Sequence, residues 1–224
     1  MANNNNQQAA PTAEQTSNQS EAFFLKYKKA IICAVVAIVV VIAGVVLYKT
    51  YVSGPNEQKA STALAKGQAY FAAEDFEKAL NGDSASYKGF IGIAKEYGST
   101  AAGNLANLYA GLCYAKLDKW QEAAQYLENF SGTDDAMISP SAEGALGNVY
   151  AHLNQLDKAV SHLKKAAEKA DNNSLSPTYL IQAGEILESQ GKKEEALKLY
   201  QQVKDKYFNS MQYQTIDAYI ERVK

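Results

Sequence analysis

The chain has 224 residues, of which 47% are hydrophobic and 21% are charged, and its formal net charge is −2 at pH 7. Such an even mixture of both signs excludes the strongly basic class of nucleic-acid-binding proteins. The two cysteines, Cys33 and Cys113, lie in an apolar segment and in a predicted helix of a separate region. They therefore exclude a disulfide framework and a cysteine-based zinc site.

The first 20 residues form a polar tail. They are rich in Asn, Gln, Ser and Thr and contain no large apolar side chain after Met1. Such a segment buries too little apolar surface to compensate for the conformational entropy lost on ordering. We therefore expect residues 1–20 to be disordered.

An uninterrupted apolar segment, Ala30 to Leu47, follows the tail. It has 18 residues, with no charged residue, no amide side chain and no proline. As a helix it is about 27 Å long, close to the roughly 30 Å hydrocarbon core of a bilayer. Aromatic residues, which favour the headgroup region, flank it on both sides: Phe23, Phe24, Tyr27, Tyr48 and Tyr51. We predict that residues 21–52 form a transmembrane anchor helix.

A cleaved signal peptide is the alternative interpretation of this segment. The apolar run is longer than the 7–15 residues usual for a signal peptide. Lys49 and Tyr51 also follow the run where a cleavage site requires small residues. These two features favour an uncleaved anchor.

The lysines around the segment predict its orientation. Lys26, Lys28 and Lys29 precede the apolar run, whereas Lys49 and Lys59 follow it. Positive charge is retained on the cytoplasmic side of a membrane. The distribution predicts a cytoplasmic N-terminus and a C-terminal domain on the other side of the membrane.

Beyond the anchor, the composition predicts helices only. Ser53-Gly54-Pro55 is expected to break the anchor helix, with residues 53–58 as a linker, because proline lacks the N–H needed to continue a helix. The segments that follow are rich in Ala, Leu, Lys, Glu and Gln and contain no alternating β-branched runs. The sequence therefore predicts an all-α protein, with a helical domain over residues 59–224.

A sequence pattern recurs four times in this domain. A glycine is followed three residues later by Tyr or Leu, and nine residues after that by an alanine. The small residues allow two helices to cross closely, and the larger residue fills the space beside the crossing. The repeated positions are Gly67, Tyr70 and Ala79; Gly111, Tyr114 and Ala123; Gly147, Tyr150 and Ala159; and Gly184, Leu187 and Ala196.

The pattern resembles the tetratricopeptide repeat (TPR) over roughly residues 60–206. The resemblance implies an α-solenoid of four antiparallel helix pairs, and the terminal segment from Tyr207 to Lys224 is expected to be a capping helix. The first unit departs from the pattern, because an insertion at residues 81–86 precedes a helix that is expected to begin near Tyr87. The consensus Trp and Pro of the repeat are missing.

No motif predicts catalysis. The chain has no glycine-rich phosphate loop, no HExxH and no GxSxG motif, and its two histidines, His152 and His162, have no ligand partner at metal-binding spacing. Trp120 is expected to pack rather than to stack on a ligand. We predict that the protein is not an enzyme and has no cofactor, metal or small-molecule substrate.

The resemblance to TPR domains implies a partner-binding groove along the first helices of the pairs. The alternative is that the leucines at these positions are buried by the first unit and its insertion. The implied groove residues are Leu105, Leu108, Leu112, Ala115 and Lys116 in unit two; Ser141, Gly144, Asn148, Ala151 and His152 in unit three; and Thr178, Ile181, Glu185, Glu188 and Ser189 in unit four.

A short tail, one span and a TPR domain together resemble the YfgM family of ancillary Sec translocon subunits. The segment IAKEYGSTAAGNLANLYAGLCY is the stretch most similar to that family. The resemblance implies a bacterial inner-membrane protein with a periplasmic domain. Its implied partners are translocon subunits, a membrane-anchored periplasmic chaperone or nascent chains. A scaffold of another envelope machine, for cell division or outer-membrane assembly, is the alternative.

Overall fold

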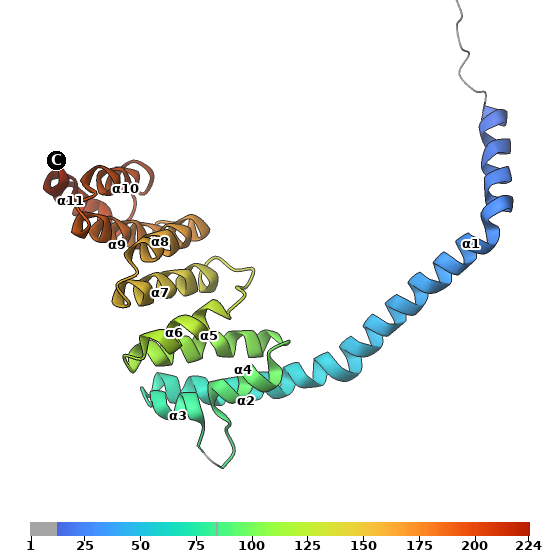
Figure 1. Ribbon diagram of the computed structural model, residues 1–224, viewed down its shortest axis with the longest axis horizontal. Helices are drawn as coiled ribbons and strands as arrows, with labels where there is room; N and C mark the ends of the chain where they lie inside the picture. The colour runs from blue at the N-terminus through green and yellow to red at the C-terminus, as the bar shows by residue number, and fades with distance from the viewer. Residues whose placement is uncertain (1–12, 84) are drawn as a thin grey trace, which may run out of the picture. The chain divides into compact units, whose positions relative to one another are not determined.

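The computed structural model describes the backbone of residues 13–83 and 85–224, and the side chains from Lys26 onward (Figure 1). Every regular element in these residues is a helix, and the described chain contains no strand. This confirms the predicted all-α fold. The chain divides into two compact units, one ending at Gly54 and the other comprising Pro55 to Lys224.

The first unit contains helix α1, Ala13–Tyr48. Its apolar side chains are exposed from Ile32 to Leu47, as Val40 (64%) and Ile42 (57%) illustrate. Among the described residues, the helical stretch Lys26–Ala72 is the one that is long and apolar enough to cross a membrane. Residues 1–12 of the tail lie outside the described residues. Residues 13–20 are the start of α1 in the structure, and the disorder of residues 1–20 stays a prediction.

The predicted helix break at Ser53-Gly54-Pro55 is wrong. A π-helical turn, Lys49–Ser53, follows α1 and leads directly into α2, Gly54–Ala72. The Gly54 N–H donates to the Lys49 carbonyl, five residues back. Pro55 is the second residue of α2, where its missing N–H removes no essential hydrogen bond. Residues 53–58 are therefore helical.

The second unit contains four helix pairs in its described residues, stacked in chain order (Figure 1). Repeat unit one begins with α2 and α3, and each later repeat unit is one pair. Three hydrophobic clusters join unit one to unit two, unit two to unit three, and unit three to unit four and the C-terminal cap. The remaining bounds are α3 Phe76–Asn81, α5 Ala101–Lys116, α6 Trp120–Glu128, α7 Ile138–His152, α8 Leu156–Ala170, α9 Ser176–Ser189 and α10 Lys193–Lys206.

Each pair is closed by a three-residue turn with the same backbone geometry. The middle residue has a positive φ in all four turns: 58° at Glu74, 58° at Asp118, 56° at Asn154 and 74° at Gly191. The next N–H donates to the carbonyl of the repeated Tyr or Leu five residues earlier, for example from Lys119 to Tyr114 at 2.9 Å. This is the Schellman type of helix ending, and it explains why the turns are equivalent despite their different sequences.

The repeated glycines lie where two helices cross. A Cβ on Gly111 would lie 2.6 Å from Leu127 Cγ, and one on Gly147 would lie 2.8 Å from Leu163 Cγ. The side chains of Ala79, Ala123, Ala159 and Ala196 have no exposed surface. The described helices therefore approach one another at the small residues that the repeat pattern identified.

Unit one fills the same space in a different way. Residues 82, 83 and 85–88 lie outside any helix where the later units have the rest of their second helix, and α4, Gly89–Tyr97, follows them. Tyr87 and Phe90 then occupy the place beside Gly67, where an added Cβ would lie 2.1 Å from the Tyr87 hydroxyl and 2.5 Å from the Phe90 ring. Gly89 has a φ of 77°, and a Cβ there would lie 2.0 Å from the Leu80 carbonyl oxygen. The start of α4 therefore requires glycine at this position.

The C-terminal cap is shorter than predicted. A 3₁₀ turn, Met211–Gln214, precedes α11, Ile216–Val223. Ile216, Ile220 and Val223 are buried in the cluster formed by units three and four, whereas Tyr213 is exposed. The helix therefore covers the last repeat as a solenoid end requires.

Gly184→Ala should destabilise the repeat domain. The new Cβ would lie 2.3 Å from the ring of Tyr200, which is fully buried and cannot move aside. Overpacking of about 1–3 kcal/mol should exceed the roughly 1 kcal/mol gained from the higher helix propensity of alanine. We expect a lower free energy of unfolding in denaturant titrations of the full chain in neutral detergent.

The matched control is Glu185→Ala, which changes an exposed neighbour on the same helix. It should leave the free energy of unfolding nearly unchanged. Equal or greater stability of Gly184→Ala would contradict the close crossing.

Candidate functional site

The predicted groove residues fall into two groups in the structure. Lys116, Asn148, Glu185 and Ser189 are exposed on the first helices of their pairs and remain candidates for partner binding. Leu108 and Ile181 have only 7% and 8% of their surface exposed. The prediction that these two residues line an open groove is wrong, because they pack in the clusters that join adjacent units.

The remaining leucines of unit two have intermediate exposure. Leu105 packs against the cluster of units one and two and also against that of units two and three, whereas Leu112 packs against the latter. The alternative for these leucines is burial by the first unit and its insertion. Unit three also covers this face, because Leu108 clusters with Ala142 and Leu146 of α7.

His152 has a specific partner that the sequence did not predict. Its ring stacks on Trp120 with a centroid distance of 3.8 Å and an interplanar angle of 3°. Trp120 begins α6 and His152 ends α7, so the stacked pair connects unit two to unit three. This contact is consistent with the packing role expected for Trp120. It also covers one face of the His152 ring with a side chain of the protein itself.

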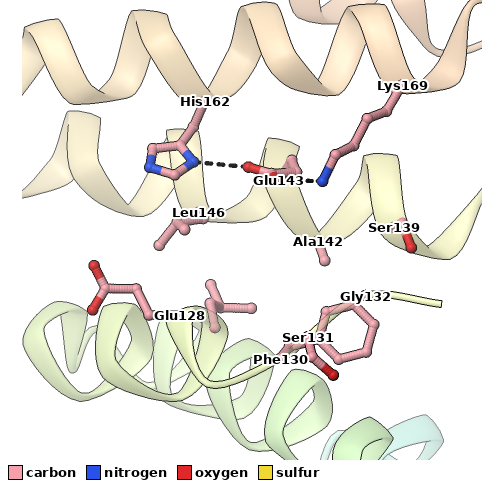
Figure 2. Close-up of a pocket in the computed structure, with 11 residues that line it drawn as sticks. Glu128, Phe130, Ser131, Gly132, Ser139, Ala142, Glu143, Leu146, His162 and Lys169 are labelled. Atoms are coloured by element: carbon pink, nitrogen blue, oxygen red, sulfur yellow. Dashed lines mark hydrogen bonds and ion pairs between the residues drawn. The ribbon is translucent and has the colours of Figure 1, made fainter.

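A charged cluster occupies the junction between the same two units (Figure 2). Glu143 of α7 is 2.8 Å from His162 Nδ1 and 2.6 Å from Lys169 Nζ, both of α8. The His162 ring stacks on Tyr150, whose hydroxyl donates a hydrogen bond to Glu128 at the end of α6. The network therefore extends from α8 across α7 to the preceding unit.

Burial and hydrogen bonds shift the pKa values of this cluster. Burial of Glu143 acts to raise its pKa, but the hydrogen bonds and charges of Lys169 and His162 outweigh it and hold that pKa below its ordinary value. Burial and the hydrogen bond to Glu128 raise the pKa of Tyr150 to about 12. Glu143 is therefore held as a carboxylate and Tyr150 as a neutral hydrogen-bond donor.

A cavity of about 260 Å³ lies beside this cluster (Figure 2). Its wall combines apolar side chains with the charged groups of Glu128, Glu143 and Lys169 and the imidazole of His162. It continues into an open hollow along the loop between α6 and α7, and both spaces share Ser131, Gly132, Ser139 and Lys169. The apolar residues of the cavity wall are Leu127, Phe130, Ala142 and Leu146.

The cavity exists because α6 ends early. Helices α8 and α10 extend 11 and 10 residues beyond Ala159 and Ala196, whereas α6 extends only 5 residues beyond Ala123. The sequence that follows α6, NFSGTDD, consists mainly of turn-forming residues, and Gly132 has a φ of 79°. The missing helical turns leave the start of α7 uncovered on this side.

Metal binding and thiol reactivity are both disfavoured in the described residues. No cluster of three or more His, Cys, Asp or Glu side chains suitable for a metal ion occurs in the part of the chain that the structure describes. Cys113 is fully buried, and burial raises the pKa of its thiol to about 12, which disfavours the reactive thiolate. The groups of this surface can bind a partner through side-chain burial, hydrogen bonds and charge.

Comparison with known protein families agrees with this geometry. A family model described as a tetratricopeptide repeat-like domain matches residues 21–223. The chain belongs to this family. The tetratricopeptide repeat-like match includes the apolar helix as well as the repeats, and domains of this type are generally non-catalytic modules that bind other proteins. No curated protein matches the chain.

Glu143→Gln should make stability less dependent on pH. Because the folded-state pKa of Glu143 lies below its ordinary value, its stabilising contribution is present above that value and is lost as the pH falls through the folded-state pKa. We expect the variant to be less stable than the natural chain by about 1 kcal/mol at pH 7. The difference should shrink as the pH falls to about 3, in denaturant titrations at each pH.

Asp217→Asn is the control, because Asp217 pairs with Lys204 where both side chains are largely exposed. It should change stability little at any pH, since solvent screens such pairs. A difference for Glu143→Gln that stays constant between pH 7 and pH 3 would contradict the assignment.

Proposed function

We propose that the protein is a membrane-tethered scaffold that uses its repeat domain to hold other proteins in the bacterial cell envelope. The observation that carries this proposal is the combination, in one chain, of an apolar helix with exposed side chains and a domain of stacked helical repeats. The family match across residues 21–223 supports this combination, because it includes both parts.

A membrane tether lowers the affinity that the repeat surface needs for its partners. Confinement to a membrane raises the local concentration of partners in the same membrane, so modest contacts suffice for stable association. Exposed polar residues on the first helices, such as Lys116, Asn148 and Glu185, suit such contacts. They provide hydrogen bonds and charge without a large exposed apolar patch.

The proposed location is the bacterial inner membrane, with the N-terminus in the cytoplasm and the repeat domain in the periplasm. The lysines that precede the apolar segment support this orientation. The partners we propose are translocon subunits, a membrane-anchored periplasmic chaperone or nascent chains. The similarity to the YfgM family supports this choice. The division into an anchor, residues 21–52, and a repeat domain, residues 59–224, is part of the same proposal.

Site-specific photo-crosslinking tests the partner assignment. A photoreactive residue at Asn148 should form adducts with translocon subunits or a periplasmic chaperone, because this position is exposed on a first helix. The same residue at Lys164, exposed on the second helix α8, is the matched control and should give weaker adducts. Recovery of cytoplasmic proteins alone from Asn148 would contradict the proposal.

A scaffold for another envelope machine, in cell division or outer-membrane assembly, is the second candidate. It would share the anchor and the repeat domain and would differ only in its partners. Purification of the full chain in mild detergent distinguishes the two candidates by the subunits that co-purify. Co-purification of division or outer-membrane assembly proteins without translocon subunits would favour the second candidate.

A further inference from the structure

We propose that the cavity between units two and three binds an extended peptide segment of a partner protein, one that carries an aliphatic side chain next to a basic one. The site is separate from the exposed residues of the first helices. This inference rests on the proposed scaffold function and specifies the chemistry of one kind of partner.

The shape of the site favours a side chain followed by an extended backbone. The cavity of about 260 Å³ accommodates one aliphatic side chain against Leu127, Phe130 and Leu146. The open hollow that continues from it runs along residues 131–136 and provides space for the flanking residues of a peptide. A single small molecule would leave this outer hollow unused.

The charges of the site favour a basic peptide. Four carboxylates line the two connected spaces, whereas Lys169 is the one lysine among the described lining residues. Glu143 is already paired with Lys169 and His162, whereas three other carboxylates that line the two spaces form no ion pair among the described residues. Those are Glu128, Asp134 and Asp135. A lysine or arginine beside the aliphatic side chain matches this arrangement.

The repeat itself shows that the polar character of the site is specific. Leu180 lies four residues before Gly184, as Glu143 lies four residues before Gly147, and Leu180 is buried with 2% of its surface exposed. The junction of units three and four therefore has an apolar residue where the junction of units two and three has a carboxylate. In unit three this position is Glu143, which pairs with Lys169 of α8 and borders the cavity.

The site is preformed, which lowers the entropy cost of binding. Asn104 of α5 holds the loop with two hydrogen bonds, from Ser131 N–H at 2.9 Å and to the Gly132 carbonyl at 3.2 Å. Ser139 donates to the Thr133 carbonyl at 2.6 Å and accepts from the Thr133 N–H at 2.7 Å. These bonds fix both ends of the hollow without filling it.

Peptide binding to the full chain in neutral detergent tests the proposal. The probes are two fluorescein-labelled peptides, Lys-Leu-Lys-Leu-Lys and Glu-Leu-Glu-Leu-Glu, and the readout is fluorescence anisotropy. We expect the basic peptide to bind and the acidic one not to bind. Salt screens the attraction between the carboxylates of the site and the basic peptide, so binding should weaken at high salt.

A charge-neutralising variant identifies the site. Glu128→Gln combined with Asp134→Asn should weaken binding of the basic peptide about tenfold, since one carboxylate of the cavity and one of the outer hollow lose their charge. The matched control is Glu194→Gln combined with Asp205→Asn, which removes the same charge from exposed positions of α10. This control should bind as the natural chain does.

Ala142→Leu tests the cavity itself, because it adds volume to the wall without changing charge. It should weaken binding of the basic peptide at least as strongly as the charge-neutralising variant does. Circular dichroism should verify that the helices of this variant remain folded. Equal binding of both peptides, equal loss in the control variant, or no binding of the basic peptide would overturn the proposal. Adducts from Asn148 with envelope proteins would still support the scaffold function in that case.

Discussion

The close crossing of two helices at a glycine is the interaction on which the rest of the repeat domain depends. An added Cβ at Gly67, Gly111, Gly147 or Gly184 would overlap a side chain of the opposite helix or of the segment that replaces it. Only at this distance do the alanines of the second helices become fully buried. The stacking of one pair on the next, and the surfaces that the pairs expose, follow from this crossing.

The four units satisfy the same constraint with different residues. Leu127, Leu163 and Tyr200 fill the space beside the glycine in units two to four, whereas Tyr87 and Phe90 fill it in unit one. Unit one can therefore tolerate a loop in the middle of its second segment, because α4 returns an aromatic ring to the required position. Unit two loses the end of its second helix instead, and there nothing replaces the missing turns. The result is a cavity with charged walls at the junction of units two and three.

The sequence predicted the repeat because glycine, tyrosine and alanine recur at fixed spacings along the chain. These spacings follow directly from the positions at which the two helices of a pair cross. The sequence did not predict which first-helix residues are exposed, since Leu108 and Ile181 have the same spacing as groove residues but pack in the clusters that join adjacent units. Burial of that kind depends on how neighbouring pairs stack. The stacked Trp120 and His152 rings lie 32 residues apart in sequence, and no local pattern predicts such a contact. The early end of α6 did have a local signal, the turn-forming run NFSGTDD, which marks where a cavity can open.

The apolar helix gives the repeat domain its proposed setting. Its side chains are exposed over a length that matches the hydrocarbon core of a bilayer. Water is an unfavourable environment for so much apolar surface, and lipid removes that cost. The positive charges before the helix then decide on which side the repeat domain lies.

Cysteine labelling in membranes tests the membrane assignment most directly. Cys33 is exposed in the described structure, within the apolar segment, whereas Cys113 is buried. If lipid surrounds α1, a water-soluble maleimide should leave Cys33 unmodified in native membranes. The positive control is a Cys113→Ala, Lys116→Cys variant, in which the exposed cysteine at position 116 should react on any membrane surface that the reagent reaches. Cys33 should react after denaturation in detergent. Labelling of Cys33 in native membranes as fast as the cysteine at position 116 would contradict the account.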